Sequence, residues 1–218
     1  MKLNFTGYFI TPIYSIEIPE WIEPLIKATD PFIKEAKYNH KKIIKERNKQ
    51  LNKKINDFGM SHHSTSLIDL DEFKQIKTFV FNASNDILNH IGYDLNGYEI
   101  HWTEMWVQEF AKNGGGHHEG HIHYDNHISG FYFLKCSDKT SYPIFHDPRV
   151  AKNMSQLPLK NDLDVNFGTQ IINYKPKPGT LILFPAYLTH QFSVDFGIQP
   201  FRFIHFNLQA IRKMIVGA

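Results

Sequence analysis

Residues 121–134 read HIHYDNHISGFYFL, and this stretch predicts two antiparallel strands joined by a tight turn. Asp125-Asn126 is a dipeptide that favours such turns. The residues after it return as an apolar and aromatic run from Ile128 to Leu134, a composition typical of strands. We therefore expect a β-hairpin with histidines on its first strand.

Similar short runs of aromatic and β-branched residues continue along the chain from Tyr98 onward. Turn signals separate them, and no helical pattern lies between them, which favours antiparallel sheets over a parallel α/β arrangement. The runs are 99–110, 121–134, 142–145, 169–174, 180–184, 190–194 and 201–208. We expect a double-stranded β-helix, the jelly-roll or cupin-like architecture, over residues 98–210.

Residues 1–97 are expected to supply an N-terminal strand and supporting helices. Apolar and polar residues alternate loosely before residue 15, which predicts one or two strands broken at Pro12. A helical stretch over 19–57 follows, and we expect Pro24 and Pro31 to divide it, because proline disfavours helix at the residue before it.

A second helix is predicted between residue 69 and Gly92. Asp69 or Asp71 can cap its first turn, and Gly92 stands where a left-handed C-terminal residue is favoured. Its apolar positions, Phe73, Ile76, Val80, Ala83, Ile87 and Ile91, recur every three or four residues. The predicted fold class is therefore α+β, with N-terminal helices packed on the β-helix core in a single domain over 1–218.

Composition excludes several classes of protein. The 218 residues are 42% hydrophobic and 21% charged, which excludes global disorder, and a net charge of +2 gives no whole-chain attraction to nucleic acid. The single cysteine, Cys136, cannot form an internal disulfide. The N-terminus has no secretory hydrophobic region, and the longest apolar run, 181–188, is too short to span a membrane. We expect a soluble, cytoplasmic protein without a membrane partner.

One segment, Lys34 to Lys54, is strongly basic. It holds nine lysines and arginines against two glutamates, a net charge of +7, so the rest of the chain carries about −5. A nucleic-acid partner is one interpretation. The other, which is commoner for a charge run, is a solvated helix face whose apolar residues Ile33, Ile44, Leu51 and Ile55 turn inward.

Histidines indicate a metal site. The chain has 13, and five of them fall within residues 117–127. Alternate side chains of a strand share a face, so His121, His123 and Asp125 are expected to project together. His190 opens a later predicted strand and is the candidate for a converging ligand. Two imidazoles with one carboxylate, or three imidazoles, are ligand sets that divalent transition metals accept.

Arg202 begins the next predicted strand, among aromatic residues. A buried guanidinium is costly unless it meets an anion, and its geometry matches a carboxylate in two hydrogen bonds. We therefore expect an anionic group beside Arg202.

The chain resembles the 2-oxoglutarate and iron(II)-dependent oxygenases, and most closely a branch common in marine bacteria and their phages. Their order of motifs extends over about half of the chain. The matching stretches are His121-Ile-His123, Ser129-Gly130 with the run to Leu134, Phe145-His-Asp147-Pro148-Arg149, Pro178-Gly179 with the run to Phe184-Pro185, His190, and Arg202 with Phe206-Asn207.

The resemblance implies that Fe(II), 2-oxoglutarate and O2 are the cofactors and that three side chains on one side of the iron hold it. His121, His123 and His190 are the favoured ligands, with Asp125 as the alternative to His121 in the register typical of the larger superfamily. The distal carboxylate of 2-oxoglutarate would lie on Arg202, with Tyr132 and Phe133 beside it.

The implied activity is that of a dioxygenase, an oxidoreductase that hydroxylates an unknown small molecule or macromolecule. Trp106 and Arg149 are candidate substrate contacts, although an ion pair with Asp147 explains Arg149 equally well. The alternative is a non-catalytic, cupin-like protein that binds a metal or small ligand, which would not need Arg202. The sequence leaves the oligomeric state open.

Overall fold

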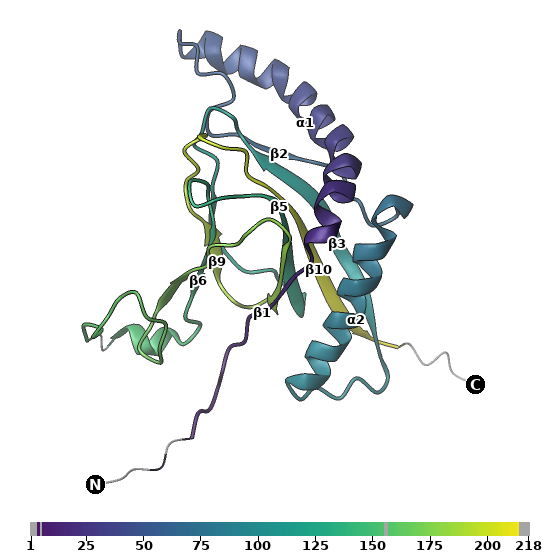
Figure 1. The fold of residues 1–218 in the computed structure, drawn as a ribbon, viewed down its shortest axis with the longest axis vertical. Coiled ribbons are helices and arrows are strands. Elements are labelled where there is room, and N and C mark those ends of the chain that lie inside the picture. Colours follow the sequence, from purple (N-terminus) through teal and green to yellow (C-terminus); the bar gives the residue numbers. More distant parts are fainter. Residues whose placement is uncertain (1–3, 5, 155–156, 214–218) are drawn as a thin grey trace.

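Two antiparallel sheets face each other in the computed structural model, which describes residues 4, 6–154 and 157–213 (Figure 1). The six-stranded major sheet has the order β1-β8-β5-β10-β3-β2. Its strands are β1 (Tyr14–Glu17), β2 (Ser61–His63), β3 (Tyr98–Phe110), β5 (Ile128–Lys135), β8 (Thr180–Pro185) and β10 (Arg202–Arg212). The four-stranded minor sheet, of order β4-β9-β6-β7, contains β4 (His118–His121), β6 (Pro143–His146), β7 (Ile171–Asn173) and β9 (His190–Phe192).

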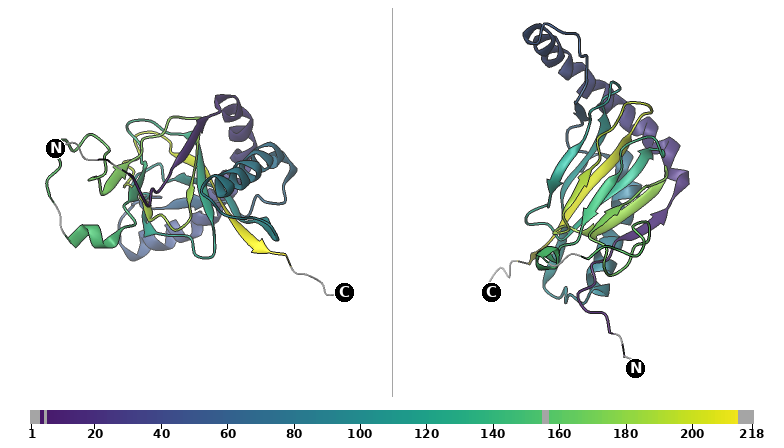
Figure 2. Two further views of the ribbon diagram at one scale, coloured as in Figure 1. Left: turned by 90° about the horizontal axis from the view of Figure 1, so that it is seen from below. Right: turned by 90° about the vertical axis from the view of Figure 1, so that its left-hand side faces the viewer.

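The helices cover the major sheet on the side opposite to the minor sheet, as Figures 1 and 2 show. They are α1 (Ile22–Gln50) and α2 (Lys74–His90), with short 3-10 turns at η1 (Pro19–Trp21), η2 (Asp71–Phe73) and η3 (Val150–Met154). The predicted α+β class, helices packed on a jelly-roll core, is confirmed. Among the described residues, neither helix has the length and apolar composition that crossing a bilayer requires.

Side chains alternate across the major sheet and so fill two separate cores. On β10, Ile204, Phe206 and Leu208 pack under the helices. Phe203 instead points between the two sheets, where it joins a core rich in phenylalanine. We call the side of the major sheet that faces the minor sheet the inner face, and the other side the helix face.

Helix α1 runs without a break through Pro31, so the predicted division of residues 19–57 is wrong. Pro24 lies in the first turn, where its missing N–H costs nothing. The stripe Leu25, Thr29, Ile33 and Ala36 is buried against the body. Burial of that stripe outweighs the one hydrogen bond that Pro31 removes.

Helix α2 is close to its prediction. Ile76, Val80 and Ile87 are buried, and Gly92 has the expected positive φ of 100°. Ile91 is 37% exposed, however, so the stripe ends earlier than predicted. Neither aspartate caps the helix, because η2 precedes it and no side-chain cap bond forms.

The predicted strands from residue 98 onward are present, with one important change. The strand predicted before the turn is β4, which ends at His121 instead of continuing to Asp125. It pairs with β9 in the minor sheet, whereas β5 lies in the major sheet, so the predicted β-hairpin is wrong. In the N-terminal part, β1 follows Pro12, and β2 was not predicted. Residues before 98 therefore add a strand to each edge of the major sheet as well as the helices.

Candidate metal centre

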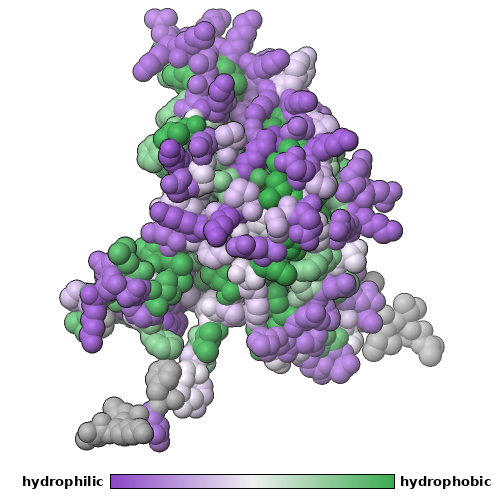
Figure 3. Space-filling view, viewed as in Figure 1, coloured by the Kyte–Doolittle hydropathy of each residue, from purple (hydrophilic) through white to green (hydrophobic). Residues whose placement is uncertain are grey.

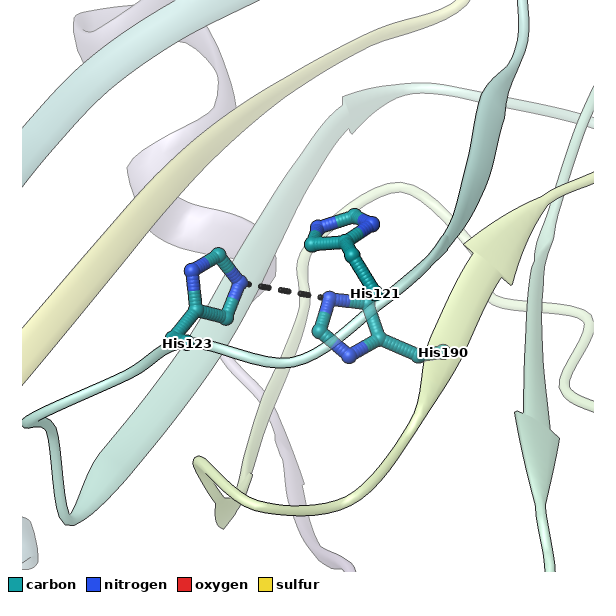
Figure 4. Close-up of side chains that lie close together, drawn as sticks. All are labelled: His121, His123 and His190. Atoms are coloured by element: carbon teal, nitrogen blue, oxygen red, sulfur yellow. Dashed lines mark hydrogen bonds between the residues drawn. The ribbon is translucent and has the colours of Figure 1, made fainter.

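Three histidines converge where the ends of β4 and β9 meet. His121 and His190 are paired across the two strands, and His123 reaches them from the segment after β4. One ring nitrogen of each residue lies within 4.8 Å of the others, and His123 Nε2 is 3.3 Å from His190 Nε2. Figure 4 shows these two nitrogens facing each other with the His121 ring alongside.

His123 lies in the segment after β4 and not on the strand itself, which strand alternation did not predict. Its backbone N–H donates to Ala186 O at 3.0 Å, which fixes the chain beside β8 after β4 has ended. Asp125 then turns the chain with a φ of +60° and is exposed. The prediction that residues 121, 123 and 125 share one strand face is therefore wrong, and Asp125 stands outside the histidine group.

Backbone carbonyls orient two of the three rings. His190 Nδ1 lies 2.9 Å from Leu188 O, and His121 Nδ1 lies 2.7 Å from Glu119 O. Because a carbonyl oxygen can only accept, both Nδ1 atoms carry the proton. In the neutral rings this leaves each Nε2 with a free lone pair, the form in which histidine binds metals.

A polar group on β3 and β10 supports His123 from the other side. Asn207 Nδ2 donates to Glu104 Oε2 at 2.6 Å and lies 3.0 Å from His123 Nδ1 and 3.1 Å from His205 Nε2. Glu104, His123 and His205 form a second group whose ligand atoms lie within 4.8 Å of one another. From the sequence, Glu104 and His205 had no predicted functional role and Asn207 was named only within a motif, although residues 205 and 207 share a strand face.

Burial keeps these imidazoles neutral. It lowers the pKa of His118, His123 and His190 to about 3 each, and it also lowers the pKa of His205. Hydrogen bonds from the His205 imidazole and the Asn207 amide lower the pKa of Glu104 to about 2. At neutral pH the site therefore combines uncharged nitrogen ligands with one carboxylate.

Aromatic side chains surround the histidines. The Trp106 ring centroid lies 4.5 Å from those of His63 and His205, so the structure brings this predicted residue next to the site. The ring of His118 stacks on that of His63, and its Nε2 lies 2.7 Å from Gln108 Nε2. Gln108 also contacts Ser61 Oγ.

Within the described part of the chain, four buried polar atoms on this inner face have no hydrogen-bond partner. They are Gln108 Oε1, Ser129 Oγ, His205 Nδ1 and Asn207 Oδ1. Unpaired buried polar atoms are costly, and a bound metal or ligand is one way to satisfy them. Their presence, together with the three converging imidazoles, fits a divalent iron ion held by nitrogen ligands.

Arg202 lies on the opposite side of the sheet from the histidines, which corrects its prediction. Phe201 and Phe203 both enter the core between the sheets, so the side chain between them turns to the helix face. There the guanidinium donates to Glu109 Oε2 and Asp30 Oδ1, each at 2.7 Å. The anion that Arg202 needs is supplied by the protein itself.

The other predicted co-substrate contacts are not assembled either. The hydroxyl of Tyr132 donates to Ile18 O at 2.7 Å on the helix face. Phe133 packs among phenylalanines of the inner core. Arg149 forms two hydrogen bonds with Asp147, at 2.9 and 2.7 Å, in agreement with the structural alternative.

Residues 104–198 match a family model whose description is "Putative 2OG-Fe(II) oxygenase". Over this segment, the chain is similar to the 2OG-Fe(II) oxygenases. The match supports the predicted family, and it agrees with the predicted enzyme class of oxidoreductase and with the predicted cofactors Fe(II), 2-oxoglutarate and O2. The branch of marine bacteria and phages stays a prediction.

Solved structures share the fold at low sequence identity. AviO1 from Streptomyces viridochromogenes has a TM-score of 0.56 at 8% identity, over 95% of this chain and 92% of that chain. A prolyl-4-hydroxylase from Pseudomonas putida has a TM-score of 0.52 at 9% identity, over 91% of this chain and 93% of that one.

A third similar structure is an oxidoreductase of the 2OG-Fe(II) oxygenase family from Burkholderia pseudomallei. It has a TM-score of 0.44 at 12% identity, and the match covers 65% of this chain. The chain spans 59% of the length of that protein. No curated protein matches the chain in sequence.

Proposed function

We propose that the protein is a hydroxylase in which His121, His123 and His190 hold the iron. The observation that carries this proposal is the convergence of three ring nitrogens within 4.8 Å, from two strands of the minor sheet and the segment between β4 and β5. Two of the three rings have their Nδ1 protons directed to backbone carbonyls. Three such ligands on one side of an iron leave positions for the co-substrate and oxygen.

The co-substrate needs donors for its distal carboxylate on the inner face. Arg202 is the only buried arginine or lysine among the described residues, and it faces the helices. Gln108 and His118 are the groups that we propose instead, because Gln108 is fully buried and the His118 ring lies 6.0 Å from that of His121. A neutral amide and imidazole can each donate one hydrogen bond to a carboxylate.

The bound iron and 2-oxoglutarate supply the oxidation of a substrate C–H bond by O2, with succinate and carbon dioxide as co-products. The chain orients the three proposed iron ligands. Leu188 O accepts from His190 and Glu119 O accepts from His121, and the amide of Asn207 contacts His123. Around them, Trp106 and the inner phenylalanine core exclude water from one side of the site.

The experiment is a succinate assay under labelled oxygen, with pools of small metabolites, peptides and oligonucleotides as substrates. We expect one labelled oxygen atom in succinate and one in the product, with no turnover when Fe(II) or 2-oxoglutarate is omitted. His190→Ala should abolish turnover. Arg149→Gln, which replaces an exposed side chain paired with Asp147, should retain it.

The alternative is a cupin-like protein that binds metal or a small ligand without catalysis. Stoichiometric iron binding without 2-oxoglutarate binding or succinate release would favour that alternative and contradict the hydroxylase.

A further inference from the structure

The second half of α1 carries far more positive charge than the protein neutralises. Between Lys34 and Lys54 nine cations stand against Glu35 and Glu46. Of these cations, Lys37 pairs with Glu109, and Arg47 donates to Asn56 O at 2.8 Å. Within the described residues, no further ion pair of this segment with an acidic side chain is formed.

This half of the helix does not cover the core. Ala36 is the last buried residue of α1, and no side chain from 37 to 54 is buried. Figure 1 shows the helix continuing past the sheets to the top of the molecule, and Figure 3 shows hydrophilic residues dominating that end. The inward face expected from the sequence holds for Ile33, whereas Leu51 is 56% exposed. Core packing therefore does not explain the segment.

Five lysines share one side of this helix. At about 100° per residue, Lys34, Lys41, Lys42, Lys45 and Lys49 fall within an arc of about 100° and extend about 22 Å along the axis. Tyr38 lies at the centre of that arc and is 67% exposed, with Lys41 Nζ 4.9 Å from its ring centroid. We call these five lysines and Tyr38 the basic face.

The opposite side of the helix is already occupied by the chain. The segment after α1 folds back on it, with the Ile55 N–H donating to Asn48 Oδ1 at 3.0 Å. Ile44 and Arg47 on that side are half-buried. A helix lying in a membrane interface would need this side free and apolar, so the arrangement disfavours a lipid surface as the partner.

We propose that the basic face of α1 binds single-stranded nucleic acid. A row of lysines neutralises successive phosphates, and an exposed aromatic ring among them offers a stacking surface to a base. An acidic polypeptide could neutralise the lysines but would make no such use of Tyr38. The basic face is separate from the histidine group. Helix α1 contacts β2 from its other side, where His40 Nδ1 lies 2.9 Å from His62 Nδ1.

The test is fluorescence anisotropy with labelled 20-nucleotide dT and U oligomers at several salt concentrations. Five phosphate contacts predict a slope of log K against log salt of about −3.5, so a fourfold rise in salt should weaken binding about 100-fold. Replacing Lys41 and Lys45 with Gln together should reduce the magnitude of the slope by about 1.4. Tyr38→Ala should weaken binding about 5- to 150-fold with little change in slope.

The matched control replaces Lys139 and Lys160 with Gln, two exposed lysines outside α1. It should leave both affinity and slope unchanged, and all variants should keep their circular dichroism and iron content. Absence of oligomer binding at 50 mM salt, or binding that the Lys41 and Lys45 replacements do not alter, would overturn the proposal. Tighter binding of a poly-glutamate peptide or of phosphatidylserine vesicles would also overturn it.

Discussion

The Nε2 atoms of His123 and His190 lie 3.3 Å apart although 67 residues separate them in the chain. His190 donates from Nδ1 to Leu188, so its neutral ring accepts at Nε2 and His123 must donate. His123 Nδ1 then accepts from Asn207. If His123 held iron through Nε2, its ring would carry the proton on Nδ1 instead. Asn207 would then have to present Oδ1, which has no hydrogen-bond partner among the described residues.

Two single substitutions distinguish the ligand sets. His121→Ala should lose stoichiometric Fe(II) or Mn(II) binding, because it removes one of three converging nitrogens. Asp125→Ala should leave the affinity within a few-fold, since Asp125 is exposed in the turn. Metal titration by calorimetry measures both, and the reverse pattern would assign the iron to His123, Asp125 and His190.

Asn207→Leu should lower iron affinity about 10- to 100-fold without abolishing binding, because partners of a ligand orient it and set its tautomer. Asn173→Leu, on an exposed position of β7, is the matched control and should bind iron as the parent does. Equal affinities for the Asn207 variant and the parent would show that Asn207 does not support His123.

Arg202→Met should destabilise the fold. The substitution leaves the buried carboxylate of Glu109 without its guanidinium partner. Because removing one member of a buried ion pair typically costs about 3–5 kcal/mol, we expect the free energy of unfolding to fall by about 3–5 kcal/mol. Lys37→Met, which removes a half-exposed partner of the same carboxylate, should cost about 1 kcal/mol or less. Urea unfolding measures both, and an unchanged midpoint with lost 2-oxoglutarate binding would restore the sequence-based role of Arg202.

The metal-free protein should lose stability in mild acid. The pKa values of His118, His123 and His190 are about 3 in the fold and about 6.5 when unfolded, so the unfolded chain binds more protons between these values. Stability should therefore fall as the pH drops below about 6.5, by up to about 1.4 kcal/mol per pH unit for each histidine. Urea unfolding with a chelator at pH 7, 6 and 5 measures the slope, which His118→Phe should reduce. A stability that does not change over this range would contradict neutral, buried histidines.

The sequence could predict the strands and the histidines of the metal centre because both depend on local patterns. Aromatic and β-branched runs identify strands, and the cluster of histidines around His121 indicates a metal site whichever of its residues are the ligands. It could not place His123 or Asp125, since the end of β4 depends on its pairing with β9 and on the contact of His123 with Ala186.

The side on which Arg202 lies is also a tertiary property. The pairing of β10 with β5 shifts register between Arg202 and Phe203, and the partners Asp30 and Glu109 come from distant parts of the chain. No spacing rule within residues 190–207 contains that information. Likewise, α1 continues through Pro31 because its buried stripe packs on the body, which proline statistics do not reveal.

Anaerobic titration of the Fe(II)-loaded protein with 2-oxoglutarate tests the account most directly, followed both by calorimetry and by the visible absorption of an iron chelate. The account predicts one equivalent of 2-oxoglutarate bound with the absorption band. Both should be lost in His190→Ala and kept in Arg202→Lys, and Gln108→Leu should weaken the binding. Iron bound at one equivalent with no 2-oxoglutarate binding, or binding that Arg202→Lys removes and Gln108→Leu does not weaken, would contradict the account.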